Sequence, residues 1–231
     1  MKKDQLILLI ALIVGVISTL ANSFHYVEVV KISRLVFLPL IYVYYCLKAQ
    51  KIHWAPTLVM ILFLLTDIYN FIIKDALFEL LVLGIVNYIL FLSFGLKDIV
   101  KFRLTFTNLI SFLIIVGFVV FLYFSVLDIA LIELNAFKVS ISIYGIILAL
   151  NAIVAAYNLS YRNRLHDLLF FFCVATFVFT DVSYLISEYY YKFPVMIVIN
   201  YVLQLLSYFF IARYFLLKER HDSRKKTLNH N

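Results

Sequence analysis

The chain has 231 residues, of which 65% are hydrophobic, 18% are aromatic and only 14% are charged. Soluble domains are roughly half apolar and about a quarter charged, so this composition excludes a soluble globular domain. The 23 Phe and 17 Tyr residues exclude a disordered chain, and the 5 Gly and 3 Pro residues exclude a collagen-like or linker-rich one. The net charge of +7 comes from residues at the ends of apolar segments, so it does not indicate a nucleic-acid partner.

Eight apolar runs follow one another along the chain. A bilayer core of about 30 Å needs about 20 mostly apolar residues per helix, and the runs lack the alternating period of a membrane barrel. The second run is short, and we expect it to extend back through Val29 and Val30, with a kink at Pro39. The predicted spans are residues 5–23, 35–47, 56–73, 77–96, 105–127, 139–158, 167–187 and 195–216.

These runs predict an all-α, polytopic bundle of eight transmembrane helices over residues 1–217. Residues 218–231 are polar and basic, which predicts a disordered cytosolic tail that contacts anionic lipid. With both termini in the cytoplasm, fourteen Lys and Arg residues lie on the inner side and five on the outer side. The five on the outer side are Lys31, Arg34, Lys74, Lys138 and Lys192.

Two adjacent spans repeat later in the chain. Residues 63–68 (Phe-Leu-Leu-Thr-Asp-Ile) match residues 177–182 (Phe-Val-Phe-Thr-Asp-Val) at an offset of 114. Residues 85–90 (Ile-Val-Asn-Tyr-Ile-Leu) match residues 198–203 (Val-Ile-Asn-Tyr-Val-Leu) at an offset of 113. Chance similarity between apolar segments is the alternative. The paired motifs favour a parallel 4+4 duplication with halves 1–103 and 104–217, related by an axis along the membrane normal.

Two acidic residues, Asp67 and Asp181, lie well inside predicted spans. A carboxylate in hydrocarbon is costly, so each is expected to face the bundle interior and to have a function. If both share one cavity, repulsion and burial would leave one carboxyl protonated and the other ionised, which makes an acid and base pair. The alternative is that both residues are interhelical polar contacts without chemistry.

Neutral polar residues near these acids predict a polar pocket inside an apolar shell. Each Asp directly follows a Thr. Three positions later, on the same helix face, comes a polar residue, Asn70 after Asp67 and Tyr184 after Asp181. This spacing predicts local hydrogen bonding. Further polar residues come from the fourth and eighth spans. The candidate substrate-binding residues are Thr66, Asn70, Asn87, Tyr88, Thr180, Tyr184, Asn200, Tyr201 and Gln204.

The sequence carries no pattern that calls for a metal or an organic cofactor. Cys46 and Cys173 lie inside separate apolar runs, as packed thiols do. The sequence has no Gly-rich phosphate loop, no HExxH and no GxSxG. We therefore expect neither a metal nor a cofactor.

Several of these residues carry a family resemblance. Leu38-Pro39 in the second span, Thr66-Asp67 in the third and Thr180-Asp181 in the seventh resemble motifs of the YhhN-type lysoplasmalogenases, a family of eight-span membrane proteins. The resemblance continues through residues 201–204 of the eighth span. The family has Lys at position 38, Gly at position 66, Ser at position 180 and a His near Asn87, so only the two Asp residues carry over unchanged.

The resemblance implies a hydrolase that cleaves the vinyl ether bond of lysoplasmalogens with two carboxyl groups and no cofactor. It implies a multi-pass protein of the bacterial inner membrane, with a lysophospholipid or other lipid as substrate. A proton-coupled carrier or a lipid-binding membrane protein without catalysis is the alternative from another class, since parallel repeats and buried acids also suit transport. A third reading is a membrane scaffold. The sequence leaves the oligomeric state open.

Overall fold

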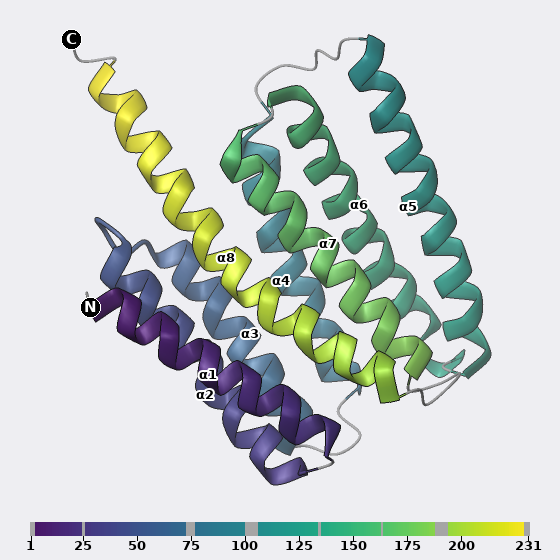
Figure 1. Cartoon of the computed structure of the whole chain (residues 1–231). Coiled ribbons are helices and arrows are strands. Elements are labelled where there is room, and N and C mark those ends of the chain that lie inside the picture. Colours follow the sequence, from purple (N-terminus) through teal and green to yellow (C-terminus); the bar gives the residue numbers. More distant parts are fainter. Residues whose placement is uncertain are drawn as a thin grey trace.

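A computed structural model of the chain describes residues 3–24, 26–72, 77–99, 106–133, 135–162, 164–187 and 194–228. These residues form eight α-helices and one short 3-10 helix, η1, at Asn135–Phe137 (Figure 1). The α-helices are α1 (Lys3–Ser23), α2 (Val27–Lys48), α3 (Trp54–Ile72), α4 (Leu77–Lys97), α5 (Phe106–Glu133), α6 (Lys138–Arg162), α7 (Leu165–Leu185) and α8 (Pro194–Leu228).

The helices follow the predicted spans closely. Seven are long and apolar enough to cross a membrane, and α3 has a shorter apolar part at Trp54–Asn70. The short second run extends back to Val27, and Pro39 lies inside α2 as expected. The all-helical membrane fold class is therefore confirmed. The predicted span ends at residues 73 and 105 lie outside the described residues, as do Lys2, Lys74, Lys101, Arg103 and Lys192 from the orientation argument.

The prediction of a disordered tail is wrong as far as Leu228, because α8 continues without a break to that residue. Residues 218–228 contain neither Gly nor Pro, and their Lys, Arg and Glu residues have high helix propensity. Once α8 is held in the bundle, extending it costs no new nucleation.

Helix α8 lies between α7 and the pair formed by α1 and α2 (Figure 1). It packs against α7 on one side and against α1 and α2 on the other. The start of α1 and the end of α8 lie at the same end of the bundle. The polar C-terminal part of α8 projects beyond the apolar body.

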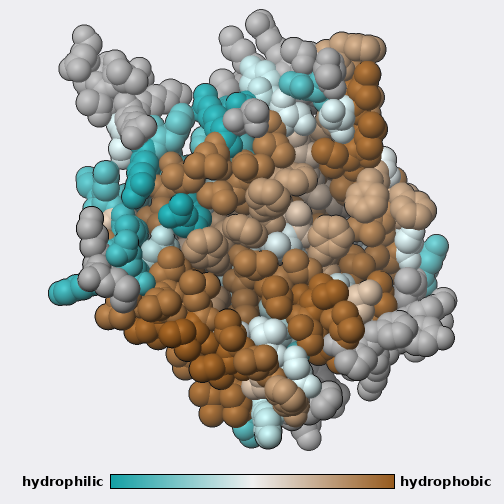
Figure 2. Space-filling model, viewed as in Figure 1, coloured by the Kyte–Doolittle hydropathy of each residue, from teal (hydrophilic) through white to brown (hydrophobic). Residues whose placement is uncertain are grey.

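The outer surface of the bundle is apolar over a broad central region (Figure 2). Helix α5 is the most exposed of the spanning helices, and its Ile114 and Phe121 are each 68% exposed. A surface this apolar is unfavourable in water, so these side chains face the lipid tails.

Stacked aromatic rings fill the centre of the bundle. Phe91 of α4 stacks on Phe170 of α7 with ring centroids 4.9 Å apart, and the ring of Tyr214 from α8 lies 5.2 Å from Phe170. All three side chains are fully buried. We call these three residues the aromatic cluster.

Candidate functional site

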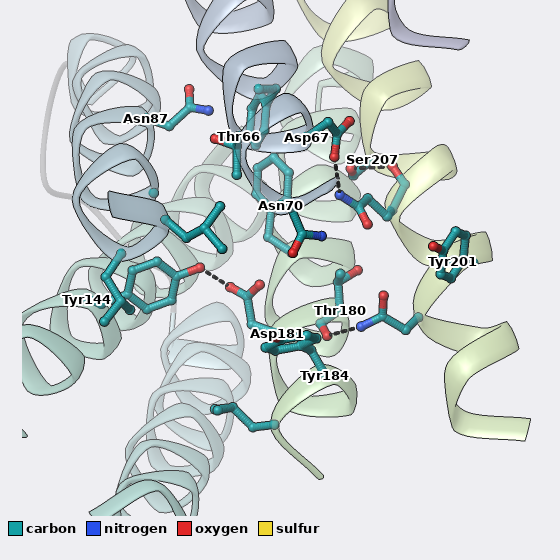
Figure 3. Close-up of a pocket in the computed structure, with 18 of the residues that line it drawn as sticks. Thr66, Asp67, Asn70, Asn87, Tyr144, Thr180, Asp181, Tyr184, Tyr201 and Ser207 are labelled. Carbon is teal, nitrogen blue, oxygen red and sulfur yellow. Dashed lines mark hydrogen bonds between the residues drawn. The ribbon is translucent and has the colours of Figure 1, made fainter. Parts of the chain in front are cut away.

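Asp67 and Asp181 line the same cavity (Figure 3), which has a volume of about 430 Å³. Asp67 comes from α3 and Asp181 from α7. The cavity reaches the end of the bundle away from the chain termini, where Asn22 lies in the last turn of α1 and Leu77 begins α4. The two acids that the sequence singled out therefore share one space, although their chemical roles remain a prediction.

Asp67 has a cation and two hydrogen-bond donors beside it. It is 1% exposed, and the Arg34 guanidinium of α2 lies 2.8 Å from its carboxylate. Tyr208 OH donates a hydrogen bond to Oδ2 at 2.7 Å, and Gln204 Nε2 donates one to Oδ1 at 3.2 Å. The Arg34 guanidinium also lies over the ring of Tyr201, 5.1 Å from its centroid. Arg34 and these two donors favour the ionised form of Asp67.

Arg34 is a site residue that the sequence analysis missed. It was counted among the outer loop cations, but α2 begins at Val27 and encloses it, and it is only 5% exposed. It lies one helical turn before Leu38, on the same face of α2. The sequence did indicate this role for Arg34. Extending the second apolar run back through Val29 places Arg34 inside a membrane span, where a charged side chain needs a partner.

Asp181 has a different environment. Tyr144 OH of α6 and Tyr88 OH of α4 both donate hydrogen bonds to its Oδ2, at 2.7 and 2.9 Å. Within the described part of the chain, no Lys or Arg lies within ion-pair distance of this carboxyl. The two carboxyl groups thus differ in charge compensation, since Asp67 has a cation and Asp181 has two phenols. Sequence reasoning missed Tyr144 and Tyr208 because mid-span tyrosines are common in apolar helices.

The partners of both acids come mainly from other helices, which corrects the expectation of local hydrogen bonding. Thr66 Oγ1 bonds the backbone of its own helix at Leu62. Asn200 Nδ2 donates to the backbone oxygen of Thr180. Asn70 and Tyr184 are exposed at the cavity lining. All nine predicted substrate-binding residues line this cavity: Thr66, Asn70, Asn87, Tyr88, Thr180, Tyr184, Asn200, Tyr201 and Gln204.

Some polar atoms of the cavity wall have no hydrogen-bond partner among the residues that the structure describes. Asn87 is 1% exposed, and both its Oδ1 and Nδ2 lack one. The same holds for Thr180 Oγ1 and Asn22 Nδ2. Buried polar groups are normally hydrogen-bonded, so these atoms are suited to bind a polar ligand or ordered water.

An apolar pocket of about 80 Å³ adjoins the polar cavity between α5, α6 and α7. Its walls are side chains such as Leu122, Leu148 and Val178. Tyr144 and Asp181 border both spaces. Asp181 therefore lies where a polar cavity meets an apolar one, and this arrangement suits an amphiphilic ligand.

The position of Tyr144 depends on a glycine. A Cβ atom added at Gly84 would lie 2.6 Å from Tyr144 Cε2, so Gly84→Ala must displace the ring that donates to Asp181. We expect this substitution to destabilise the protein by about 1–3 kcal/mol, as overpacking does. Thermal unfolding in detergent measures the effect.

Gly117→Ala is the matched control, because a Cβ there meets nothing within 4 Å. It should leave the melting temperature unchanged or raise it slightly, since Ala favours a helix by up to about 1 kcal/mol over Gly. Equal destabilisation by both substitutions would show that the Gly84 contact with Tyr144 is unimportant.

One group of side chains in the described structure could hold a metal ion. Ligand atoms of Asp98, His166 and Asp167 all lie within 4.8 Å of one another, beyond the aromatic cluster from the two central acids. Lys218 Nζ already lies 2.8 Å from Asp98 Oδ2 and supplies a positive charge there. The sequence analysis did not find this group because α4 and α7 bring its members together only in the fold.

Comparisons of this chain with protein-family models, with curated proteins and with solved structures find no match. The assignment of a function to the cavity therefore depends on its geometry and on the motifs quoted above.

Proposed function

We propose that this protein is a membrane-embedded hydrolase that cleaves the vinyl ether bond of lysoplasmalogen-type lysolipids. The observation that carries the proposal is the unequal pair of carboxyl groups in one cavity. Asp67 lies beside the Arg34 guanidinium, which favours its ionised form, while Asp181 accepts hydrogen bonds from two phenols. Because an uncompensated carboxylate is costly inside a membrane, Asp181 is the group that carries a proton. An acid and an ionised partner are the two groups that this chemistry needs.

The reaction begins when Asp181 gives its proton to the vinyl ether carbon that is not bonded to oxygen. The C=C π electrons form the new C–H bond, and the other vinyl carbon becomes part of an oxocarbenium ion. The negative charge of Asp67 stabilises this cation. Water then attacks the oxocarbenium carbon and returns a proton to the Asp181 carboxylate. The resulting hemiacetal breaks its bond to the glycerol oxygen and releases an aldehyde and an alcohol, so one water is consumed for each lipid.

The two adjoining spaces suit a single-chain lipid. The apolar pocket between α5, α6 and α7 would hold the first part of the hydrocarbon chain, and the lipid-facing surface of α5 would hold the rest. The glycerol and head group would lie in the polar cavity, in contact with Asn87 and Thr180. The bond to be cleaved would then lie at Asp181, which borders both spaces.

The polar cavity does not connect to the cavity at the opposite end of the bundle in the described structure, as expected of a hydrolase that takes its lipid from one side. The polar cavity and the cavity at the opposite end share no lining residue. On each of α4, α7 and α8, a member of the aromatic cluster lies between the residues that line one cavity and those that line the other. A lipid hydrolase needs access to its site from one side of the membrane only, whereas a carrier must also adopt a second conformation that opens to the other side.

We place both termini in the cytoplasm of a bacterial cell, so that the polar cavity opens on the outer side of the inner membrane. Reporter fusions after residues 97 and 228 should be cytoplasmic, and one after residue 187 should be external. An external reporter after residue 228 would contradict this topology. We also propose the parallel duplication, supported by the paired Thr-Asp motifs on α3 and α7 that line one cavity.

The test of the proposed function is aldehyde release by the purified full chain. We expect aldehyde release from lysoplasmalogens in detergent or bilayers, and no release of fatty acid, the product of ester hydrolysis, from a lysolipid with an acyl ester in the same position. The ester is the matched control, since it has the same head group and chain length but no vinyl ether to protonate. Equal activity on both lipids, or on neither, would refute the proposal.

A further inference from the structure

A second cavity, of about 1230 Å³, lies at the end of the bundle that carries the chain termini. It is formed where the α2–α3 connection, the end of α4, the junction of α6 and α7, and the C-terminal part of α8 meet. Hydrophilic side chains gather at this end of the molecule (Figure 2). The cavity takes no part in the proposed hydrolysis, because the aromatic cluster separates it from Asp67 and Asp181.

The wall of this cavity has more cations than anions. Its basic residues come from four separate places in the fold, and each of the three carboxylates that line it already has a partner. Lys218 lies 2.8 Å from Asp98. Glu219 accepts a hydrogen bond from the backbone N–H of Lys51 at 2.8 Å, and Asp222 lies 3.5 Å from the ring of His221. The five cationic side chains are Lys51, Lys97, Arg162, Arg164 and Lys218.

Neither Arg162 nor Lys97 forms an ion pair with a carboxylate among the described residues, and Arg164 Nη1 lies 3.1 Å from His221 Nε2. These three side chains come from the ends of α4 and α6 and from the start of α7, so the fold brings them together around one space. Like charges repel, and three of them held around a cavity favour an anion inside it.

The N-termini of α3 and α7 also line this cavity. The first turn of α3, at Trp54 and Ala55, lines the cavity. So does Arg164, the N-cap of α7, whose side chain makes no capping hydrogen bond. The N-terminus of a long helix carries a partial positive charge and unpaired N–H donors, which suit a phosphate.

We propose that this cavity binds a phosphate group through Arg162, Arg164 and Lys97, carried either by an anionic phospholipid head group or by a soluble phosphate ester. The surplus of positive charge favours this ligand over a metal ion at the neighbouring Asp98, His166 and Asp167, where Lys218 already occupies the position of a cation. With the topology proposed above, this end faces the cytoplasm and the anionic inner leaflet.

The experiment uses the full chain in nanodiscs and separates the two sources. One arm compares phosphatidylcholine nanodiscs with and without 10 mol% phosphatidylglycerol, and native mass spectrometry counts the retained phosphatidylglycerol. The other arm titrates glycerol 3-phosphate into protein in pure phosphatidylcholine nanodiscs, with calorimetry as the readout. We expect saturable binding of about one phosphate per chain in at least one arm, weakened by salt. The arm that binds identifies the source.

A matched pair of variants tests the location. Arg162→Gln should weaken phosphate binding about tenfold, since it removes a charge-assisted contact. Arg220→Gln removes the same charge from an exposed position on α8 that does not line the cavity, and it should change the affinity less than twofold. A Lys97→Gln variant provides a second test if Arg162→Gln does not fold. No saturable binding in either arm, or equal weakening by Arg162→Gln and Arg220→Gln, overturns the proposal.

Discussion

Asp181→Asn should lower the rate of aldehyde release about 1,000-fold, within the range that a general acid contributes. The amide keeps the shape of the side chain and still offers an oxygen to Tyr144 and Tyr88, but it has no acidic proton to give. Single-turnover release from a lysoplasmalogen measures the effect. Because no ion pair is lost in the described structure, the melting temperature should change little.

Two further variants interpret that result. Tyr144→Phe removes one hydrogen bond to Asp181 and should reduce turnover less than Asp181→Asn does. Asp181→Leu should lose both turnover and some stability, since both phenols lose their acceptor. An Asp181→Asn protein that keeps full activity would end the hydrolase proposal and leave Asp181 as an interhelical contact.

Asp67→Asn should destabilise the protein by about 3–5 kcal/mol, a cost typical of breaking a buried ion pair. The substitution leaves the Arg34 guanidinium, which is 5% exposed, without its carboxylate. Arg cannot lose its proton, so the charge stays buried. This expectation differs from that for Asp181→Asn, although the sequence presents the two Asp residues as equivalents. Thermal unfolding in detergent, followed by circular dichroism, measures the difference.

Substituting the partner residue, Arg34, and combining both substitutions test whether the loss of the ion pair causes this destabilisation. Arg34→Gln should cost less than Asp67→Asn, because the remaining carboxyl can take up a proton and become neutral. The variant that carries both substitutions should be more stable than Asp67→Asn alone, since neither charge is then buried without a partner. If the double variant is as unstable as the sum of the two single ones, the ion pair is not what holds this region.

Composition and the length of the apolar runs were enough to predict the membrane fold and most helix bounds. These features depend on local chemistry, because a bilayer requires every backbone group in a span to be satisfied within its own helix. The same local reasoning located Asp67 and Asp181, since an acid inside a span stands out in a single sequence. It failed for residues 218–228, where helix propensity outweighed polarity once α8 was anchored in the bundle.

The sequence by itself determined the class of the protein, the number of helices and the two acids that share a cavity. Only the tertiary structure decided that the acids differ, because Arg34 reaches Asp67 from α2 while Tyr144 reaches Asp181 from α6. Side-chain partners on separate helices depend on helix rotation and packing, and a periodic apolar pattern does not fix either one. The cationic cavity at the other end became visible for the same reason, since its charges lie at the ends of different helices and meet only in three dimensions.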